Sequence, residues 1–183
     1  PYAPVDYKGP RIISPPVGPG VLSPLELEHV RALYAGMVTF VDTWIGRFLE
    51  KAEAAGLLEN TVVVFVSDHG TFLGEQGCIG KDQGLLRTQL THVPLLIRHP
   101  QKSWSGRRIR GFASHTDVMP TLLDMLEIEI PSRVTGHSLR PMADGNQASR
   151  RDFVVTGWDN HGAIRNADWL YVGRWNPGEG WDD

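Results

Sequence analysis

The sequence is poor in three features that would each have marked a class of protein. Cys78 is its only cysteine, which excludes an internal disulfide framework. No apolar run approaches the length that spans a membrane. The charges nearly balance at a formal net charge of −3, so the overall composition predicts neither a nucleic-acid partner nor an anionic membrane partner. With 183 residues, the chain can hold one ordinary domain with a sizeable core, and its composition leaves the compartment open.

The amino-terminal part combines an irregular arm with a long helix. Residues 1–22 are rich in proline and glycine and predict a loop or an extended arm. Ser23 then predicts a helix cap, with Pro24 in the first turn and Glu26 reaching back to the cap. Gly56 is a plausible end of this helix. Apolar residues recur at three- and four-residue steps and predict one face packed in a core: Leu27, Val30, Tyr34, Met37, Val41, Trp44, Ile45 and Phe48.

Shorter patterns predict the remaining elements. The apolar run at 61–66 is typical of a strand buried on both faces, and a glycine-punctuated irregular loop follows it to about residue 89. Beyond this loop the patterns predict strands at 93–97 and 109–114, a helix at 118–127, a strand at 153–155, and a hairpin joining 163–166 to 170–174. Strand–helix alternation followed by a hairpin indicates an α/β core leading into a smaller antiparallel part.

The residues directly after the first strand are the strongest candidates for chemistry. In open α/β sheets, ligands bind outside the carboxyl ends of the strands. Asp68 and His69 occupy that position, and Gly70 allows the chain to turn sharply there. The pair could supply two ligands to one metal, or Asp68 could cap a turn beside an ordinary polar His69. Lys81, the only cation of the loop from 67 to 81, could neutralise an oxyanion next to a metal or could be a solvated surface lysine.

Several ordered motifs resemble one known family. The segment Val64–Pro100, with its Ser-Asp-His-Gly, Leu-Gly-Glu-Gln-Gly, Gly-Lys and His-Val-Pro-Leu-Leu-Ile-Arg-His-Pro runs, resembles the second metal-site region of the sulfatases. That family belongs to the alkaline phosphatase-like superfamily. Four further segments are similar to parts of the same proteins: Tyr34–Arg47, Thr116–Asp124, Gly136–Leu139 and Ala163–Tyr171. The resemblance therefore covers nearly all of residues 24–175.

The resemblance implies a fold and a partial set of site residues. The expected fold is an alkaline phosphatase-like α/β core with helices packed on a mainly parallel sheet, leading into a small antiparallel piece. Residues 1–145 would form the carboxyl-terminal portion of the catalytic domain, and residues 146–183 would begin the small subdomain. Asp68 and His69 would bind a divalent cation, calcium above all, with manganese or magnesium as alternatives. Lys81 would contact the sulfate group and the leaving oxygen.

The family's nucleophile motif does not occur in this sequence. In sulfatases a Cys- or Ser-x-Pro-x-Arg motif supplies the residue that is oxidised to formylglycine, whereas Cys78 is followed by Ile-Gly-Lys. Two ligands also cannot fill the coordination sphere of calcium, which takes about six to eight oxygens. The chain is therefore expected to be a fragment of a longer enzyme, with the nucleophile outside it.

Other polar residues are weaker candidates. His92, before the second strand, could contact substrate, and His115 could approach the same site. Asp117 is interpreted as a helix cap rather than a ligand. Arg87 could point into a substrate pocket or face solvent. Core packing is the expected role of most of the six tryptophans, although the late ones could line a pocket.

Three functions follow from these patterns. The first is part of a metal-dependent sulfuric-ester hydrolase that acts on a sulfated small molecule or saccharide. The second is a phosphonate or phosphate ester hydrolase on the same scaffold, since tetrahedral oxyanions of sulfur and phosphorus use similar sites. The third is a non-catalytic binding or structural module, which applies above all to the isolated chain.

Overall fold

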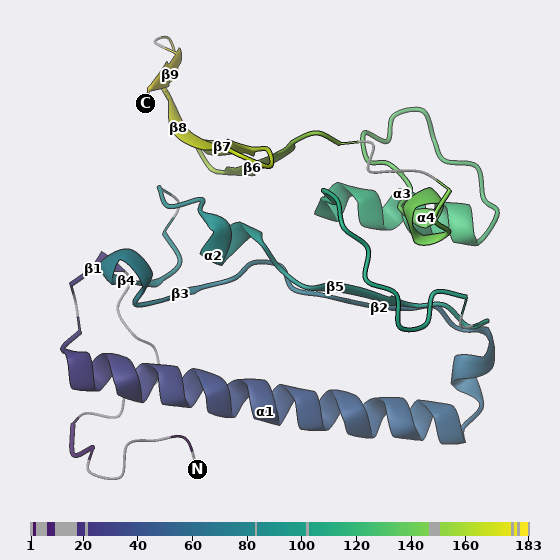
Figure 1. Ribbon diagram of the computed structural model, residues 1–183, viewed down its shortest axis with the longest axis horizontal. Helices are drawn as coiled ribbons and strands as arrows, with labels where there is room; N and C mark the ends of the chain where they lie inside the picture. Colours follow the sequence, from purple (N-terminus) through teal and green to yellow (C-terminus); the bar gives the residue numbers. More distant parts are fainter. Residues whose placement is uncertain are drawn as a thin grey trace. The chain divides into compact units, whose positions relative to one another are not determined.

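The computed structural model describes residues 2, 7–9, 18–20, 22–82, 84–101, 103–146, 151–176, 178 and 180–182 (Figure 1). Its contacts divide the chain into two compact units, Pro1–Ile97 and Arg98–Asp183, and each is described here by itself. The expected boundary between core and subdomain, after residue 145, stays a prediction. Within the described residues, no helix combines the length and the apolar character that crossing a membrane requires.

The first unit is built along α1, Pro24–Ala54 (Figure 1). The Ser23 backbone N–H donates to Glu26 Oε2 at 2.8 Å, and the Glu26 N–H donates to Ser23 Oγ at 3.4 Å, so the predicted capping box is present. The helix has 31 residues and is about 46 Å long. Gly56 follows its end at a φ of 72°, where glycine carries no steric penalty. Both predicted ends of this helix are confirmed.

The apolar stripe of α1 is buried only near the two ends of the helix. Val30 and Ala52 are buried, and Arg31 Nε donates to the carbonyl oxygen of Leu73 at 2.6 Å, which ties the first turns to the loop beyond β2. In the middle of the stripe, the side chains of Met37 and Phe48 are 59% and 66% exposed. The prediction that the whole stripe packs in a core is therefore wrong for this chain, because α1 meets the rest of its unit mainly near its ends.

The predicted strand after the helix forms but has little cover. A short 3₁₀ helix, η1 at Leu57–Asn60, leads into β2, Val63–Val66, which pairs with β5, Leu95–Arg98, in a two-stranded sheet. Phe65 and Val66 remain 40% and 38% exposed. The prediction of a strand buried on both faces is thus wrong, because the described residues place only one neighbouring strand beside β2.

The glycine-punctuated loop is more ordered than its sequence indicates. It contains four short elements, namely β3 at Phe72–Leu73, η2 at Glu75–Gly77, β4 at Cys78–Gly80 and α2 at Thr88–Thr91. Strand β4 pairs antiparallel with β3 and with β1, Gly18–Pro19, which belongs to the expected arm. Most other residues of the arm lie outside the described part of the chain. Phe72, Cys78 and Leu90 form a small buried core that holds the loop together.

The second unit begins with helices. A 3₁₀ turn, η3 at His115–Asp117, leads into α3 at Val118–Met125, which confirms the predicted helix, and α4 follows at Arg140–Ala143. Residues 109–114 have no strand pairing, so the strand predicted there is wrong. A strand requires a partner for its backbone N–H and C=O groups as well as a suitable sequence.

The second unit ends in the predicted antiparallel sheet. Its strands β6 (Val154–Trp158), β7 (His161–Arg165), β8 (Leu170–Asn176) and β9 (Gly180–Asp182) lie in chain order. The turn between β7 and β8 depends on Asn166, whose side-chain oxygen accepts from the N–H groups of Asp168 and Trp169 at 2.9 and 2.7 Å.

Candidate functional site

A tight backbone contact positions the residues that follow β2. The N–H of Gly70 donates to the carbonyl oxygen of Leu90 at 2.8 Å, so the turn is seated against α2. A Cβ at position 70 would lie 1.9 Å from the carbonyl oxygen of Gln89, which is far inside van der Waals contact. Ser67 Oγ also donates to the carbonyl oxygen of His69 at 2.8 Å. Glycine is therefore required at position 70 because two backbones approach closely there.

Three predicted site residues meet at this turn. His69 Nε2 lies 3.4 Å from Asp68 Oδ2, and Lys81 Nζ lies 3.0 Å from the same His69 nitrogen. Lys81 directly follows β4, which the β3–β4 pairing folds back toward the end of β2. Although twelve residues separate Lys81 from His69, the loop brings their side chains into hydrogen-bonding distance. We call Asp68, His69 and Lys81 the DHK cluster.

The hydrogen bonds of the DHK cluster orient the ring of His69. Its Nδ1 lies 2.7 Å from the carbonyl oxygen of Gly70, and its Nε2 lies 3.0 Å from Lys81 Nζ and 3.4 Å from Asp68 Oδ2. The carbonyl oxygen can only accept, so it favours a proton on Nδ1. In that tautomer, Nε2 offers the lone pair with which a neutral imidazole binds a metal ion.

The carboxylate of Asp68 is ionised and accessible. The pKa of Asp68 lies below its ordinary value, chiefly because the His69 backbone N–H donates to Oδ1 at 2.8 Å, and electrostatic attraction to the His69 and Lys81 side chains adds to this effect. The side chain of Asp68 is 84% exposed. Its outer oxygen, Oδ2, consequently keeps lone pairs that can bind a cation.

These donors fit part of a divalent-cation site. Because calcium–oxygen distances are about 2.3–2.6 Å, one cation can contact two donors that lie 3.4 Å apart. In the described ranges, no group of three or more His, Cys, Asp or Glu side chains is arranged to hold a metal. The cluster thus provides two ligands, and a complete coordination sphere needs further oxygens.

The roles of the remaining predicted candidates stay predictions. His92 ends α2, where its backbone N–H donates to the carbonyl oxygen of Thr88 at 2.9 Å, and its side chain is exposed. Its role in binding substrate stays a prediction. Arg87 caps the other end of α2 through its backbone and is exposed as well. Trp169 is 78% exposed, so it is not a core residue of its unit.

Asp117, in the second unit, is the polar residue whose environment was least visible in the sequence. It is only 1% exposed, and its carboxylate accepts from the N–H groups of Ser114 and His137, both at 2.8 Å. Arg151 adds two donors, with Nε at 3.0 Å from Oδ2 and Nη2 bonded to Oδ1. The Ser114–Asp117 capping box could be read from the sequence, whereas Arg151, 34 residues away, could not.

The bonds to Asp117 define its role. Burial alone would raise its pKa, but the hydrogen bonds from Arg151, His137 and Ser114 outweigh burial, and the pKa lies below its ordinary value. In turn, the hydrogen bond to Asp117 raises the pKa of Arg151. Both oxygens of Asp117 are occupied by protein donors, so this carboxylate stabilises the junction of η3, the 136–139 loop and residue 151. Asp117 stands at the N-cap position of α3 but makes no side-chain cap hydrogen bond there, and its carboxylate instead completes the Ser114 capping box of η3.

Comparison with known proteins identifies a matching family model and several relatives of this chain. The family model described as Sulfatase matches residues 2–128. An arylsulfatase of Clostridium perfringens is 34% identical over 138 residues, which cover 74% of this chain and 28% of that protein. An N-acetylglucosamine-6-O-sulfatase of Bacteroides thetaiotaomicron is 30% identical over 161 residues, covering 81% of this chain and 28% of the relative. The chain therefore spans less than a third of the length of these curated relatives.

One solved structure shares the fold over most of the chain. It shows a protein in complex with its substrate D-glucosamine-2-N,6-O-disulfate, and it matches with a TM-score of 0.74 at 28% identity. The match covers 86% of this chain and 34% of that one. The mixed helices and sheets of this chain thus correspond to part of an alkaline phosphatase-like α/β fold, as predicted.

Proposed function

Because this chain belongs to the sulfatase family, we propose that it contributes part of the metal site and the leaving-group side of an enzyme that hydrolyses sulfuric esters of saccharides. The observation that carries the proposal is the DHK cluster, in which a carboxylate, an imidazole and an ammonium meet at the end of one strand. This combination suits a tetrahedral oxyanion, since a cation and an ammonium can neutralise different oxygens of the same group.

Asp68 Oδ2 and His69 Nε2 would hold the divalent cation. We propose calcium, with manganese and magnesium as the alternatives, and further ligands from outside the described residues. When bound, the cation would polarise a sulfate oxygen as a Lewis acid. The contribution of this chain is to fix the two donors: the Gly70 carbonyl holds the His69 ring, and the His69 backbone N–H orients the carboxylate of Asp68.

Lys81 would act on the sulfate ester. Its Nζ lies 3.0 Å from His69 Nε2, the same nitrogen that would bind the cation. With Nε2 bound to a cation, Lys81 would instead contact a sulfate oxygen and the leaving oxygen. Such a contact would offset the negative charge that builds on the leaving oxygen as the S–O bond breaks.

We place the nucleophile, a formylglycine, outside this chain, because the motif that would carry it is absent from the sequence. The proposed substrate class, a sulfated saccharide, is supported by the N-acetylglucosamine-6-O-sulfatase relative and by the disulfated glucosamine in the structural neighbour. The activity proposed here is that of the whole enzyme, which is several times longer than this chain in the relatives.

A titration with divalent cations tests the metal site directly. We expect the purified chain to bind Mn²⁺ or Ca²⁺ weakly in calorimetry. Asp68→Asn and His69→Gln should each weaken binding at least about tenfold, since even outer-shell changes cost 10- to 100-fold. Lys81→Met should bind the cation as tightly as the unsubstituted chain or more tightly, because it removes a positive charge and a competitor for Nε2. Equal affinity in all four proteins would contradict the proposed site.

A turnover measurement tests the location of the nucleophile. We expect the isolated chain to show no hydrolysis of an aryl sulfate, even with calcium added, because its sequence lacks the nucleophile motif and its described residues provide only two metal ligands in the DHK cluster. Turnover that survives repurification and disappears in Lys81→Ala would show instead that the chain contains all of its catalytic groups.

A further inference from the structure

One stretch of this mildly acidic chain is strongly basic. Residues 83–116 contain six arginines and lysines and no aspartate or glutamate, although the whole chain has a net charge of −3. Within the second unit, three of these cations fall in the run Arg107-Arg108-Ile109-Arg110, which we call the arginine loop. The loop lies outside the proposed metal site and has no role in the chemistry described above.

The arginine loop is fixed to the body of the second unit. Just before it, the Trp104 indole N–H donates to Asp144 Oδ1 at 2.7 Å. Arg107 itself donates to the carbonyl oxygen of Ala143, at the end of α4, and its backbone N–H donates to the carbonyl oxygen of Trp104 at 3.1 Å. Trp104 and Arg107 therefore anchor the start of the loop, and this anchoring reduces the entropy that a bound ligand would have to remove.

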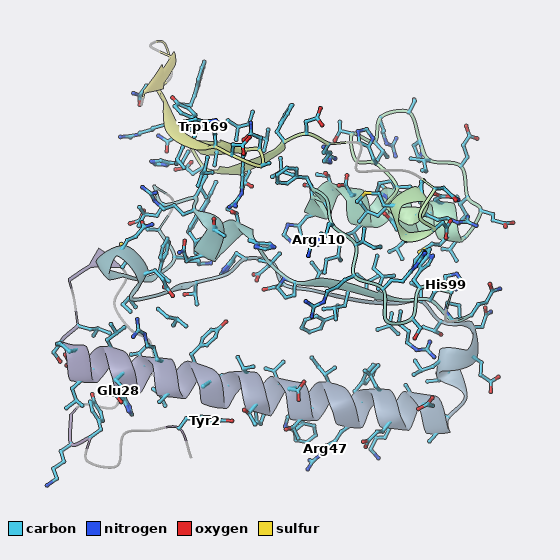
Figure 2. The ribbon with its side chains drawn as sticks, viewed as in Figure 1. Tyr2, Glu28, Arg47, His99, Arg110 and Trp169 are labelled. Atoms are coloured by element: carbon cyan, nitrogen blue, oxygen red, sulfur yellow. The ribbon has the colours of Figure 1, made fainter. Side chains whose placement is uncertain are left out.

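The two other arginines are free to bind. Arg108 and Arg110 are exposed, and within the described residues neither makes a hydrogen bond or an ion pair; Figure 2 labels Arg110. Ile109 between them is 48% exposed, so a ligand that reaches the arginines also meets an apolar side chain. Arg108 and Arg110 are separated by one residue in the sequence, so a single extended anionic ligand could contact both.

The chemistry of arginine narrows the choice of ligand. Its planar guanidinium forms paired hydrogen bonds with the oxygens of tetrahedral and carboxylate anions. A single small anion would leave some N–H donors of the two guanidinium groups without a ligand contact, whereas a chain with repeated sulfate groups can contact both arginines at once.

We propose that the arginine loop binds the sulfate groups of a sulfated polysaccharide, through Arg108 and Arg110. The choice of a sulfated glycan rests on the proposed function, whereas the presence of an anion site rests on the free arginines alone. The loop would hold the polymer through its sulfate groups. It would thereby favour polymeric over monomeric substrates without taking part in the reaction.

The test uses the purified chain, fluorescent heparin oligosaccharides, and hyaluronan of similar length as an unsulfated control. The double variant Arg108→Gln/Arg110→Gln is compared with Arg133→Gln/Arg174→Gln, which removes the same charge from two other exposed arginines of the same unit. We expect the first variant to weaken heparin binding about tenfold or more, since each basic residue near an anionic surface contributes about 1 kcal/mol. The matched control should change binding less than twofold. Circular dichroism and urea unfolding verify that both variants fold.

Salt dependence gives a second readout. The slope of log K against log salt should become shallower by about two in the Arg108/Arg110 variant, because two contacts to the polyanion are lost. Equal losses in the two double variants, unchanged binding in the first, or binding of hyaluronan or duplex DNA as tight as that of heparin would each overturn the proposal. The Arg108/Arg110 variant should leave the cation titration intact. A failure of this proposal is therefore distinct from a failure of the metal site.

Discussion

Two aspartates of this chain, each beside a turn that contains a tightly packed glycine, have opposite environments. Asp68 is 84% exposed, accepts one backbone hydrogen bond, and keeps an outer oxygen near His69 and Lys81. Asp117 is 1% exposed and accepts four hydrogen bonds, two of them from Arg151. A carboxylate that the protein has fully hydrogen-bonded stabilises the fold, whereas one with spare lone pairs can bind an ion or a ligand.

The glycines in the two turns, unlike the aspartates, have similar environments. A Cβ on Gly70 would lie 1.9 Å from the carbonyl oxygen of Gln89, and a Cβ on Gly136 would lie 1.9 Å from that of Thr116. Close backbone approach thus accompanies both the exposed and the buried aspartate. What separates the two sites is the supply of donors around the carboxylate, not the tightness of the turn.

The largest expected effect on stability comes from substituting the buried aspartate, Asp117. Asp117→Ala should lower the free energy of unfolding by about 3–5 kcal/mol, because it leaves the Arg151 guanidinium and two backbone N–H groups without their acceptor. Urea unfolding followed by circular dichroism measures the change. In a double-mutant cycle with Arg151→Gln, the two substitutions should be strongly non-additive. Additive effects would show that the ion pair contributes little.

The next largest losses of stability are expected from substituting the two glycines, Gly70 and Gly136. Gly136→Ala and Gly70→Ala should each destabilise the chain by about 1–3 kcal/mol, because the added methyl group forces neighbouring backbone apart. Gly70→Ala should also weaken cation binding, since it displaces the turn that carries Asp68 and His69. The control is Gly46→Ala in α1, where nothing lies within 4 Å of the added Cβ. This change should stabilise the helix by about 0.5–1 kcal/mol. Equal effects at all three positions would contradict the close-contact argument.

The response to acid should also depend on Asp117. Its folded-state pKa is lowered, so its contribution to stability is complete above the unfolded-state value of about 3.9. That contribution is lost as the pH falls through the folded-state pKa. Between pH 5 and pH 2, the urea midpoint should therefore fall more steeply in the unsubstituted chain than in Asp117→Asn. Parallel curves would show that Asp117 is not the group responsible.

The smallest effect on stability is expected at the exposed aspartate. Asp68→Asn should leave the free energy of unfolding nearly unchanged, because the side chain is largely in solvent. The same substitution should nevertheless have a large effect on cation affinity. A loss of stability comparable to that of Asp117→Ala would remove the distinction between a structural and a ligand-binding carboxylate.

The local elements could be predicted because their causes lie close together in the sequence. The capping box at Ser23, the end of α1 near Gly56 and the β7–β8 hairpin each depend on residues a few positions apart. The prediction that the α1 stripe and β2 are fully buried was wrong, because burial depends on which partners are present. Met37, Phe48 and Phe65 have the composition of core residues but little cover in this chain.

The amino-acid sequence by itself determined the residue types of the candidate site, the order of the elements and the family to which the chain is assigned. Only the tertiary structure decided that Lys81 lies within hydrogen-bonding distance of His69, twelve positions earlier in the sequence. It likewise decided that Arg151 donates hydrogen bonds to Asp117, 34 positions earlier. It also decided that Arg108 and Arg110 have no ion pair or hydrogen bond among the described residues. The physical reason is that hydrogen bonds and ion pairs depend on distances in space, and folding brings distant parts of the chain within a few ångströms of each other.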